Sequence, residues 1–244
     1  MNKKLLKLTA IVCAVGMLVG CAASGEKDKE GSRPERNIDT SKPLIALTFD
    51  DGPNLTTTPK VLDMLEKYEI VGSFFLIGSN MVPGTSDVVK RAYDMGCDIE
   101  SHSLTHSYMN KMSAEEIHEE MDKTASMIEA IIGERPKFFR PPYLAVNNTM
   151  YDTIDETFIA GYGCDDYDPK VDVQTRIDKV IAGARDGAIV LLHDAQGNQK
   201  TVDALDVIIP KLKEAGYEFV TVSELFAIKA VAPEEYKMYS YVPK

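Results

Sequence analysis

Two adjacent aspartates, Asp50 and Asp51, end an apolar run and stand directly before a Gly-Pro turn in the stretch LTFDDGP. Two neighbouring carboxylates that are partly buried repel each other, which raises the free-energy cost of ionising both. A bound cation would offset that cost and let both stay charged. The pair therefore indicates either a cation site or a coincidence. Reactive residues at similar places elsewhere in the chain would favour the cation site.

Two histidines with a spacing suited to one metal ion follow another apolar segment. In SHSLTH, His102 and His106 are four residues apart, which can bring both imidazoles to one side of a turn. Surface or capping histidines can show the same spacing, but the chain has only four histidines. His193 ends the apolar run IVLLH, whereas His118 lies among glutamates on an expected helix and is interpreted as a surface residue.

Two further polar segments also come directly after apolar runs. FFRPPY contains Arg140, whose guanidinium can pair with a carboxylate at two points. YGCDDYDP contains Asp165, Asp166 and Asp168. Each segment alone could be a charged loop. Because five apolar runs each end in a reactive group, coincidence is a poor explanation for the set.

The apolar runs alternate with helical patterns, which predicts a parallel sheet in an α/β fold. The expected strands are Leu44–Phe49, Gly72–Ile77, Cys97–Ser101, Lys137–Phe139, Gly161–Asp165, Ala188–Leu192 and Glu218–Val222. Expected helices include one from Ser113, which opens a Ser-Ala-Glu-Glu capping box, to Gly133, and one near Thr149–Ala160. We predict a single α/β domain, a distorted (β/α) barrel with about seven mainly parallel strands. Reactive groups in such barrels lie at the C-terminal ends of the strands.

The N-terminus has the pattern of an export signal. Three lysines precede an apolar run that is too short to span a bilayer. The following Leu-Val-Gly-Cys resembles the bacterial lipobox, in which the cysteine, here Cys21, is lipidated. An ordinary cleaved signal with a chance cysteine is the alternative. We predict a lipoprotein signal peptide at 1–20 and a lipidated, flexible tether at 21–42, whose polar composition cannot form a core. The expected location is the extracytoplasmic face of a bacterial cell membrane.

Charge and cysteine content limit the other possibilities. The net charge of −11 is unsuited to nucleic acid, so no nucleic-acid partner is expected, and we predict a monomer. Beyond the N-terminal segment the chain has Cys97 and Cys164. These could pair in an exported protein, but we favour two separate, mostly buried thiols.

In their order along the chain, TFDDGP, HSLTH, RPPY, the aspartate-rich segment and LLHD resemble the motifs of the polysaccharide deacetylase family. This family is also called the NodB-homology domain or carbohydrate esterase family 4. The resemblance spans roughly 43–230, which leaves 231–244 as a C-terminal tail. It implies a metal-dependent hydrolase that removes acetyl groups from extracellular polysaccharide or oligosaccharide. It also implies a divalent cation, Zn²⁺ first, with Co²⁺ or Ni²⁺ as alternatives.

The resemblance implies a role for each motif residue at the metal. Asp51, His102 and His106 would bind the cation and leave positions open for water and substrate. Asp50 would be the general base, and Arg140 would keep it oriented. The residues alone leave the opposite assignment of the two aspartates open.

The remaining motifs imply the rest of the hydrolytic machinery. The backbone N–H of Tyr143 would share the oxyanion with the cation. His193 would be the general acid, and Asp168 would hold that imidazole and tune its pKa. Leu191 would line a small pocket for the acetyl group.

Two departures from the family motifs concern the substrate groove. We align the family's D-x-x-D-W with residues 165–169, which puts Pro169 at the tryptophan position, and Leu144 stands where the family's R-P-P-Y-G has glycine. The first substrate hypothesis is N-acetylglucosamine in peptidoglycan or related oligosaccharides, because a short tether would hold the domain near the wall. Acetylxylan ester is the alternative. An inactive glycan-binding lipoprotein is a third hypothesis, which the intact motif residues argue against.

Overall fold

The computed structural model describes residues 36–243, which belong to one compact unit. The predictions for the signal peptide, for Cys21 and for most of the tether lie outside the described residues. Within 36–243, no helix is both long and apolar enough to cross a bilayer.

The strands of the described residues form one parallel sheet in the order β6-β7-β1-β2-β3-β4-β5-β9, and β8 also pairs with β1. The strands are β1 Leu44–Asp50, β2 Ser73–Leu76, β3 Asp98–Ser101, β4 Phe138–Phe139, β5 Thr157–Ile159, β6 Tyr162–Gly163, β7 Ala188–His193, β8 Glu218–Phe219 and β9 Met238–Tyr239. The predicted α/β class with a barrel-like parallel sheet is confirmed. The sheet has two strands more than expected, β5 and β9.

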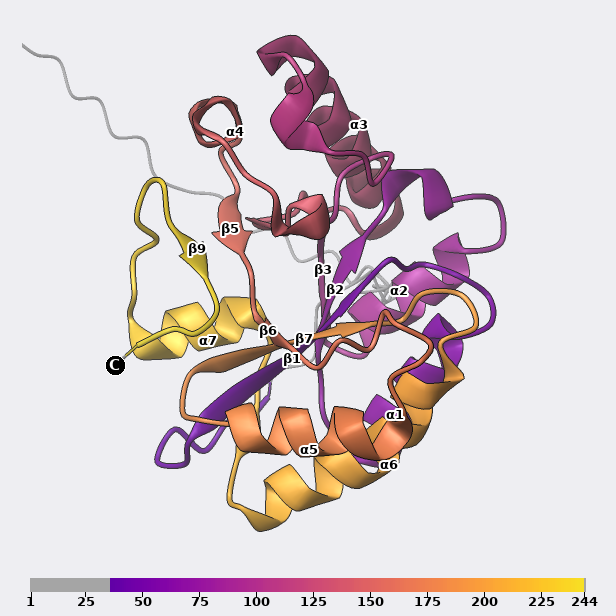
Figure 1. Cartoon of the computed structure of the whole chain (residues 1–244), viewed down its shortest axis with the longest axis vertical. Helices are drawn as coiled ribbons and strands as arrows, with labels where there is room; N and C mark the ends of the chain where they lie inside the picture. The colour runs from indigo at the N-terminus through magenta and orange to yellow at the C-terminus, as the bar shows by residue number, and fades with distance from the viewer. Residues whose placement is uncertain (1–35, 244) are drawn as a thin grey trace, which may run out of the picture. The chain divides into compact units, whose positions relative to one another are not determined.

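Helices lie between the strands, as the alternating pattern predicts (Figure 1). The α-helices are α1 Thr58–Lys67, α2 Ser86–Asp94, α3 Ala114–Ile132, α4 Asn148–Thr153, α5 Val173–Gly183, α6 Gln199–Glu214 and α7 Val222–Lys229. Short 3₁₀ turns are η1 Gly78–Asn80, η2 Met109–Lys111 and η3 Pro142–Leu144. The capping box at Ser113 and the left-handed Gly133 at the end of α3 are both present. The helix predicted to run to Ala160 ends at Thr153, and β-favouring residues then form β5.

Strand β1 is the centre of the fold and is buried along its whole length. Successive side chains of a strand point to opposite faces. Ile45, Leu47 and Phe49 pack against α1, α5 and α6, whereas Leu44 and Ala46 belong to a second cluster on the other face. Figure 1 shows α5 and α6 side by side, and these two helices are in contact. The two apolar layers hold the end of β1 in a fixed position.

The segment 231–244, which the sequence sets apart as a tail, contributes to the sheet. Strand β9 pairs with β5, and Ala188 at the start of β7 then bridges to Tyr241 in the antiparallel sense. The N–H of Ile189 donates to Ser240 O at 3.1 Å, and the N–H of Val242 donates to Gly187 O at 2.8 Å. The last residues therefore connect β5 to β7, and the boundary at residue 230 is too early. The strand is too short for its pattern to show in the sequence.

Cys97 and Cys164 are both buried and are not bonded to each other. The prediction of two separate buried thiols is therefore confirmed.

Candidate active site

The reactive residues singled out from the sequence meet at one edge of the sheet. Asp50 is the last residue of β1 and lies in register with His193, the last residue of β7. His102 follows β3, and Arg140 follows β4. These strand ends open into a cavity of about 550 Å³, whose lining residues are Asp50, Asp51, His102, His106, Pro141, Tyr143, Leu144, Gly161, Gly163, Asp165, Tyr167, Leu191 and His193. The shared edge agrees with the general rule for parallel α/β sheets.

Asp51, His102 and His106 form a cluster that could hold a metal ion. One possible ligand atom from each residue lies within 4.8 Å of the others. The Nε2 atoms of His102 and His106 lie 3.6 Å and 3.4 Å from Asp51 Oδ1. Two imidazole nitrogens and one carboxylate oxygen form a donor set that suits Zn²⁺ and leaves room for further ligands.

A backbone hydrogen bond fixes the tautomer of His102. Its Nδ1 lies 2.6 Å from Arg140 O, and a carbonyl oxygen can only accept, so Nδ1 carries the proton. The lone pair is then on Nε2, which faces Asp51. The ring is 3% exposed, and burial lowers its pKa, although the charges of Asp50 and Asp51 oppose the shift. A neutral imidazole with Nε2 free is the form that binds a metal.

The carboxylate of Asp51 supports the same conclusion. Its Oδ1 atom is buried and has no hydrogen-bond partner within the described residues. A buried carboxylate oxygen without a partner is costly, and a cation between Asp51 and the two imidazoles would remove that cost. The residues therefore fit a divalent cation.

The neighbouring Asp50 has a different environment. Its Oδ1 accepts a hydrogen bond from Arg140 Nη1 at 2.5 Å, and Arg140 Nη2 donates to Thr48 Oγ1 at 2.8 Å. Arg140 is fully buried, and its guanidinium lies over the Phe75 ring. Burial alone would raise the pKa of Asp50, but the charge of Arg140 and its hydrogen bond lower it below the usual value. Asp50 therefore stays ionised, with Oδ2 3.7 Å from His102 Nε2.

The partner of His193 is Asp166, so the prediction that Asp168 holds this imidazole is wrong. Asp166 Oδ1 lies 2.8 Å from His193 Nδ1, and Asp166 Oδ2 accepts from the backbone N–H of His193 at 2.8 Å. Asp168 instead accepts from Lys170 N within its own turn. The aromatic residue after Asp166 was the missed signal, because Asp166-Tyr167 matches the Asp-Trp end of the family motif. Tyr167, and not Pro169, therefore occupies the tryptophan position.

The Asp166 carboxylate favours the protonated form of His193. Burial would lower the pKa of His193, but the hydrogen bond and charge of Asp166, with smaller contributions from Asp50 and Asp51, raise it to about 9. The imidazole therefore carries a proton near neutral pH. The ring of Tyr167 meets that of His193 edge to face, with 5.7 Å between the ring centres.

Comparison with known proteins identifies the family. The sequence profile described as polysaccharide deacetylase matches residues 37–159, about half of the chain. The chain belongs to the polysaccharide deacetylase family. It is 49% identical over 228 residues to the bifunctional xylanase/deacetylase of Pseudobutyrivibrio xylanivorans. The aligned residues make up 93% of this chain and 38% of that protein. It is 39% identical over 195 residues to the peptidoglycan-N-acetylglucosamine deacetylase PgdA of Listeria monocytogenes. The aligned residues make up 79% of this chain and 41% of that protein. The chain thus spans about two fifths of the length of these relatives.

Solved structures agree with this assignment. The Xyl-CE4 domain of a multidomain xylanase from the hindgut metagenome of Trinervitermes trinervoides matches with a TM-score of 0.81 and 52% identity, over 82% of this chain and 98% of that one. A family 4 acetyl xylan esterase from Clostridium thermocellum, in complex with a cobalt ion, matches with a TM-score of 0.80 and 41% identity. This match covers 82% of this chain and 100% of the esterase chain. The fold of this chain is therefore that of its family.

Tyr143 and Leu144 form an unusual turn that lines the cavity. Both have positive φ angles, 60° and 53°, which non-glycine residues rarely adopt. The Tyr143 ring stacks on Tyr108, with 4.0 Å between the ring centres, and meets the His106 ring edge to face. These contacts hold the turn although Leu144 replaces the glycine of the family motif.

Leu191 lines the same cavity, and two glycines leave space beside it. A Cβ atom at Gly161 would come within 3.0 Å of Leu191 Cβ, and one at Gly163 within 3.4 Å of Leu191 Cδ2. Side chains at these positions would therefore fill the wall of the cavity. The two glycines therefore keep this part of the cavity open.

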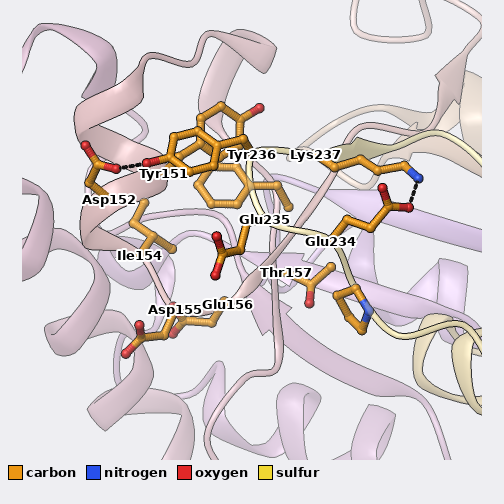
Figure 2. A pocket seen from close by; sticks show the side chains of 12 residues that line it. Tyr151, Asp152, Ile154, Asp155, Glu156, Thr157, Glu234, Glu235, Tyr236 and Lys237 are labelled. Carbon is orange, nitrogen blue, oxygen red and sulfur yellow. Dashed lines mark hydrogen bonds and ion pairs between the residues drawn. The ribbon is translucent and has the colours of Figure 1, made fainter.

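A second cavity, of about 440 Å³, lies at the opposite ends of the strands (Figure 2). It is lined by residues before and at the start of β5 and by residues before β9. Figure 2 shows Glu235 between Tyr236 and the pair Asp155 and Glu156. Its lining has no histidine and none of the deacetylase motif residues. Residues of the family motifs line the first cavity instead.

Proposed function

We propose that this protein hydrolyses acetyl groups on carbohydrate with the help of a divalent cation. One observation supports the proposal above the others. The Asp51-His102-His106 cluster shares a single cavity with a paired base candidate and a paired acid candidate, Asp50 and His193. Hydrolysis of an acetyl group needs a cation to polarise the carbonyl, a base and an acid. This cavity contains a candidate cation site, a candidate base and a candidate acid.

The proposed reaction assigns one task to each side chain. Asp50, which is ionised and oriented by Arg140, accepts a proton from the water that attacks the acetyl carbonyl. The backbone N–H of Tyr143 donates a hydrogen bond to the oxyanion. His193, which Asp166 holds in its protonated form, gives its proton to the departing sugar nitrogen or oxygen.

Asp51, His102 and His106 are the proposed ligands of the cation. A divalent cation such as Zn²⁺, Co²⁺ or Ni²⁺ would polarise the carbonyl and lower the pKa of a water molecule at this site. The unpartnered Asp51 Oδ1 and the neutral His102 support this assignment.

Two acetylated carbohydrates are candidate substrates. N-acetylglucosamine in peptidoglycan or its fragments is the first candidate, supported by the relative PgdA and by the predicted tether near the cell wall. The edge-to-face Tyr167 beside His193 also offers the aromatic surface that Pro169 could not provide. Acetylated xylan is the second candidate, which the higher identities to the xylanase/deacetylase and to the Xyl-CE4 domain favour.

We further propose that the protein is a monomeric lipoprotein. Cys21 would carry the lipid at the extracytoplasmic face of a bacterial membrane, as the lipobox-like sequence predicts. The short polar tether would then place the domain near the membrane surface.

Acetate release tests the reaction and the substrate together. Protein lacking residues 1–35 is loaded in turn with Zn²⁺, Co²⁺ or Ni²⁺ and supplied with N-acetylglucosamine oligomers, wall fragments and acetylated xylan. We expect metal-dependent release, with the higher kcat/KM on N-acetylglucosamine substrates. Release from xylan alone would select the second candidate. No release from any of the three by metal-loaded, folded protein would contradict the proposed function.

A further inference from the structure

A carboxylate from helix α3 holds the backbone between the two histidine ligands. Glu120 Oε2 accepts hydrogen bonds from the N–H groups of Leu104 and Thr105, both at 2.9 Å. Glu120 Oε1 accepts a third from Thr105 Oγ1 at 2.7 Å. Glu120 is only 8% exposed. A buried carboxylate needs donors, and Glu120 finds three of them in one two-residue stretch.

The residues on either side of Leu104 and Thr105 have a backbone that requires such support. Ser103 and His106 have φ angles of 68° and 57°, in the left-handed region that non-glycine residues seldom adopt. A backbone of this kind persists only where its surroundings hold it. On the other side of the loop, Gly78 N donates to Ser103 O at 2.9 Å, and Ser79 N donates to Leu104 O at 2.8 Å. Turn η1 therefore holds the carbonyls, and Glu120 holds the amides.

The two histidines depend on this support to different degrees. His102 directly follows β3, is almost fully buried and bonds through Nδ1 to Arg140 O. The His106 side chain is 27% exposed, and its ring meets Tyr143 and His102 only by ring contacts. Its backbone N–H donates to Ser103 Oγ within the loop. The position of His106 is therefore set through the loop.

We propose that Glu120 is a positioning residue that sets His106 at the metal site. This inference rests on the proposed function for the identity of the site, but not for the hydrogen bonds. Glu120 acts through its reach to the Leu104 and Thr105 amides, and not through its charge. Partners that orient metal ligands from outside the site typically change metal affinity by about 10- to 100-fold when they are removed.

Two substitutions separate reach from charge. Glu120→Gln keeps the length of the side chain, and its carboxamide oxygen can accept from both amides while its NH₂ donates to Thr105 Oγ1. Glu120→Asp keeps the charge but is one methylene too short to reach them. Titration of metal-free protein with Co²⁺, followed by visible absorption, should show wild-type affinity for Glu120→Gln and a loss of about 10- to 100-fold for Glu120→Asp. The neighbouring Glu119→Gln, an exposed residue paired with Lys123, is the matched control and should leave the affinity unchanged.

Hydrogen exchange of the metal-free protein gives a readout that is independent of the cation. A peptide covering 102–106 should exchange slowly in the wild type and in Glu120→Gln, and faster in Glu120→Asp. Equal affinity and equal exchange in the Asp variant would overturn the proposal. A loss in the Gln variant as large as in the Asp variant would overturn it too, because charge would then matter and not reach. Neither measurement uses deacetylase activity, so an inactive protein would contradict the proposed function without affecting this test.

Discussion

Two neighbouring residues of the same type have opposite environments at this site. Asp50 is still part of the extended strand β1, whereas Asp51 has a φ of 75° and belongs to the turn that follows. The change of backbone region sends the two carboxylates in different directions. One meets the buried guanidinium of Arg140, and the other leaves an oxygen without a partner beside two imidazoles. The cost of two adjacent charges is thus offset by Arg140 at Asp50, and the proposed divalent cation would offset it at Asp51.

Substitution of the two aspartates should therefore give two different defects. Asp51→Ala should lose the bound metal, measured by elemental analysis after dialysis, and activity with it. Asp50→Asn should keep the metal and lose a factor on the order of 10² or more in kcat, the usual size of a general-base contribution. The opposite pattern would mean that the roles are exchanged.

Thermal unfolding provides the control for Asp50→Asn. This substitution leaves the buried Arg140 without its charged partner, which commonly costs about 3–5 kcal/mol of stability. Activity is therefore compared at a temperature where the variant is folded.

The pH profile should depend on Asp166 and not on Asp168. His193 must be protonated to act as the acid, so kcat should fall as the pH rises through the pKa of His193. This pKa lies at about 9 without a cation and lower with the cation bound. Removal of the carboxylate in Asp166→Asn leaves burial to lower that pKa, so the decline should move to lower pH. Asp168→Asn is the control and should keep the wild-type profile. Profiles are compared with the same metal, because its positive charge lowers the pKa of His193 in every variant. A shift in Asp168→Asn alone would restore the original assignment.

At the scale of elements, the sequence predicts what has a local cause. The capping box at Ser113, the terminal Gly133 and the buried run of β1 each depend on residues close together in the chain, and all are present. Strands β5 and β9 have three and two residues and depend on pairing with segments that are distant in the sequence, β5 with β4 and β9, and β9 with β5. No local pattern therefore shows them.

Most residues of the candidate site could also be predicted from the sequence, because they belong to local motifs. Its motifs are short and lie at strand ends, which the alternating pattern locates. The partner of His193 could not, because three aspartates stand within four residues and only the folded turn decides which of them points inward. Asp166 is buried, and its Oδ2 accepts a hydrogen bond from Thr201 Oγ1. The carboxylate of Asp168 accepts instead from the backbone N–H of Lys170 in its own turn.

The contribution of the C-terminal segment to the sheet can be measured with two glycines. Gly187 and Gly216 have φ angles of 83° and 86°, so alanine at either position should cost roughly 1–2 kcal/mol. A Cβ at Gly187 would also lie 2.0 Å from Val242 O, whereas one at Gly216 would meet nothing within 4 Å. Urea unfolding should therefore show Gly187→Ala to be less stable than Gly216→Ala by about 1–3 kcal/mol. Equal losses would mean that the last residues do not pack against β7.

At the scale of the whole molecule, the site exists only when distant segments come together. Its residues come from β1, the loop after β3, the turn after β4, the segment after β6 and the end of β7. The likeness to the Xyl-CE4 domain covers 82% of this chain at a TM-score of 0.81, so the framework that assembles the site is shared. We therefore expect the choice of substrate to depend on side chains that line the cavity, such as Tyr143, Leu144 and Tyr167.

The predicted anchor determines where the domain acts, and it can be tested with two cysteines. Cys21→Ala removes the residue that would carry lipid, so the protein should leave the membrane fraction or accumulate unprocessed. Cys13→Ala removes a cysteine from the preceding apolar run and is the matched control, which should remain membrane-bound at its mature size. A flexible tether of this length has a root-mean-square reach of roughly 25 Å, which would keep the domain within the inner part of the wall. If Cys21→Ala stays in the membrane fraction at mature size, the lipoprotein proposal fails, and peptidoglycan loses the argument from location.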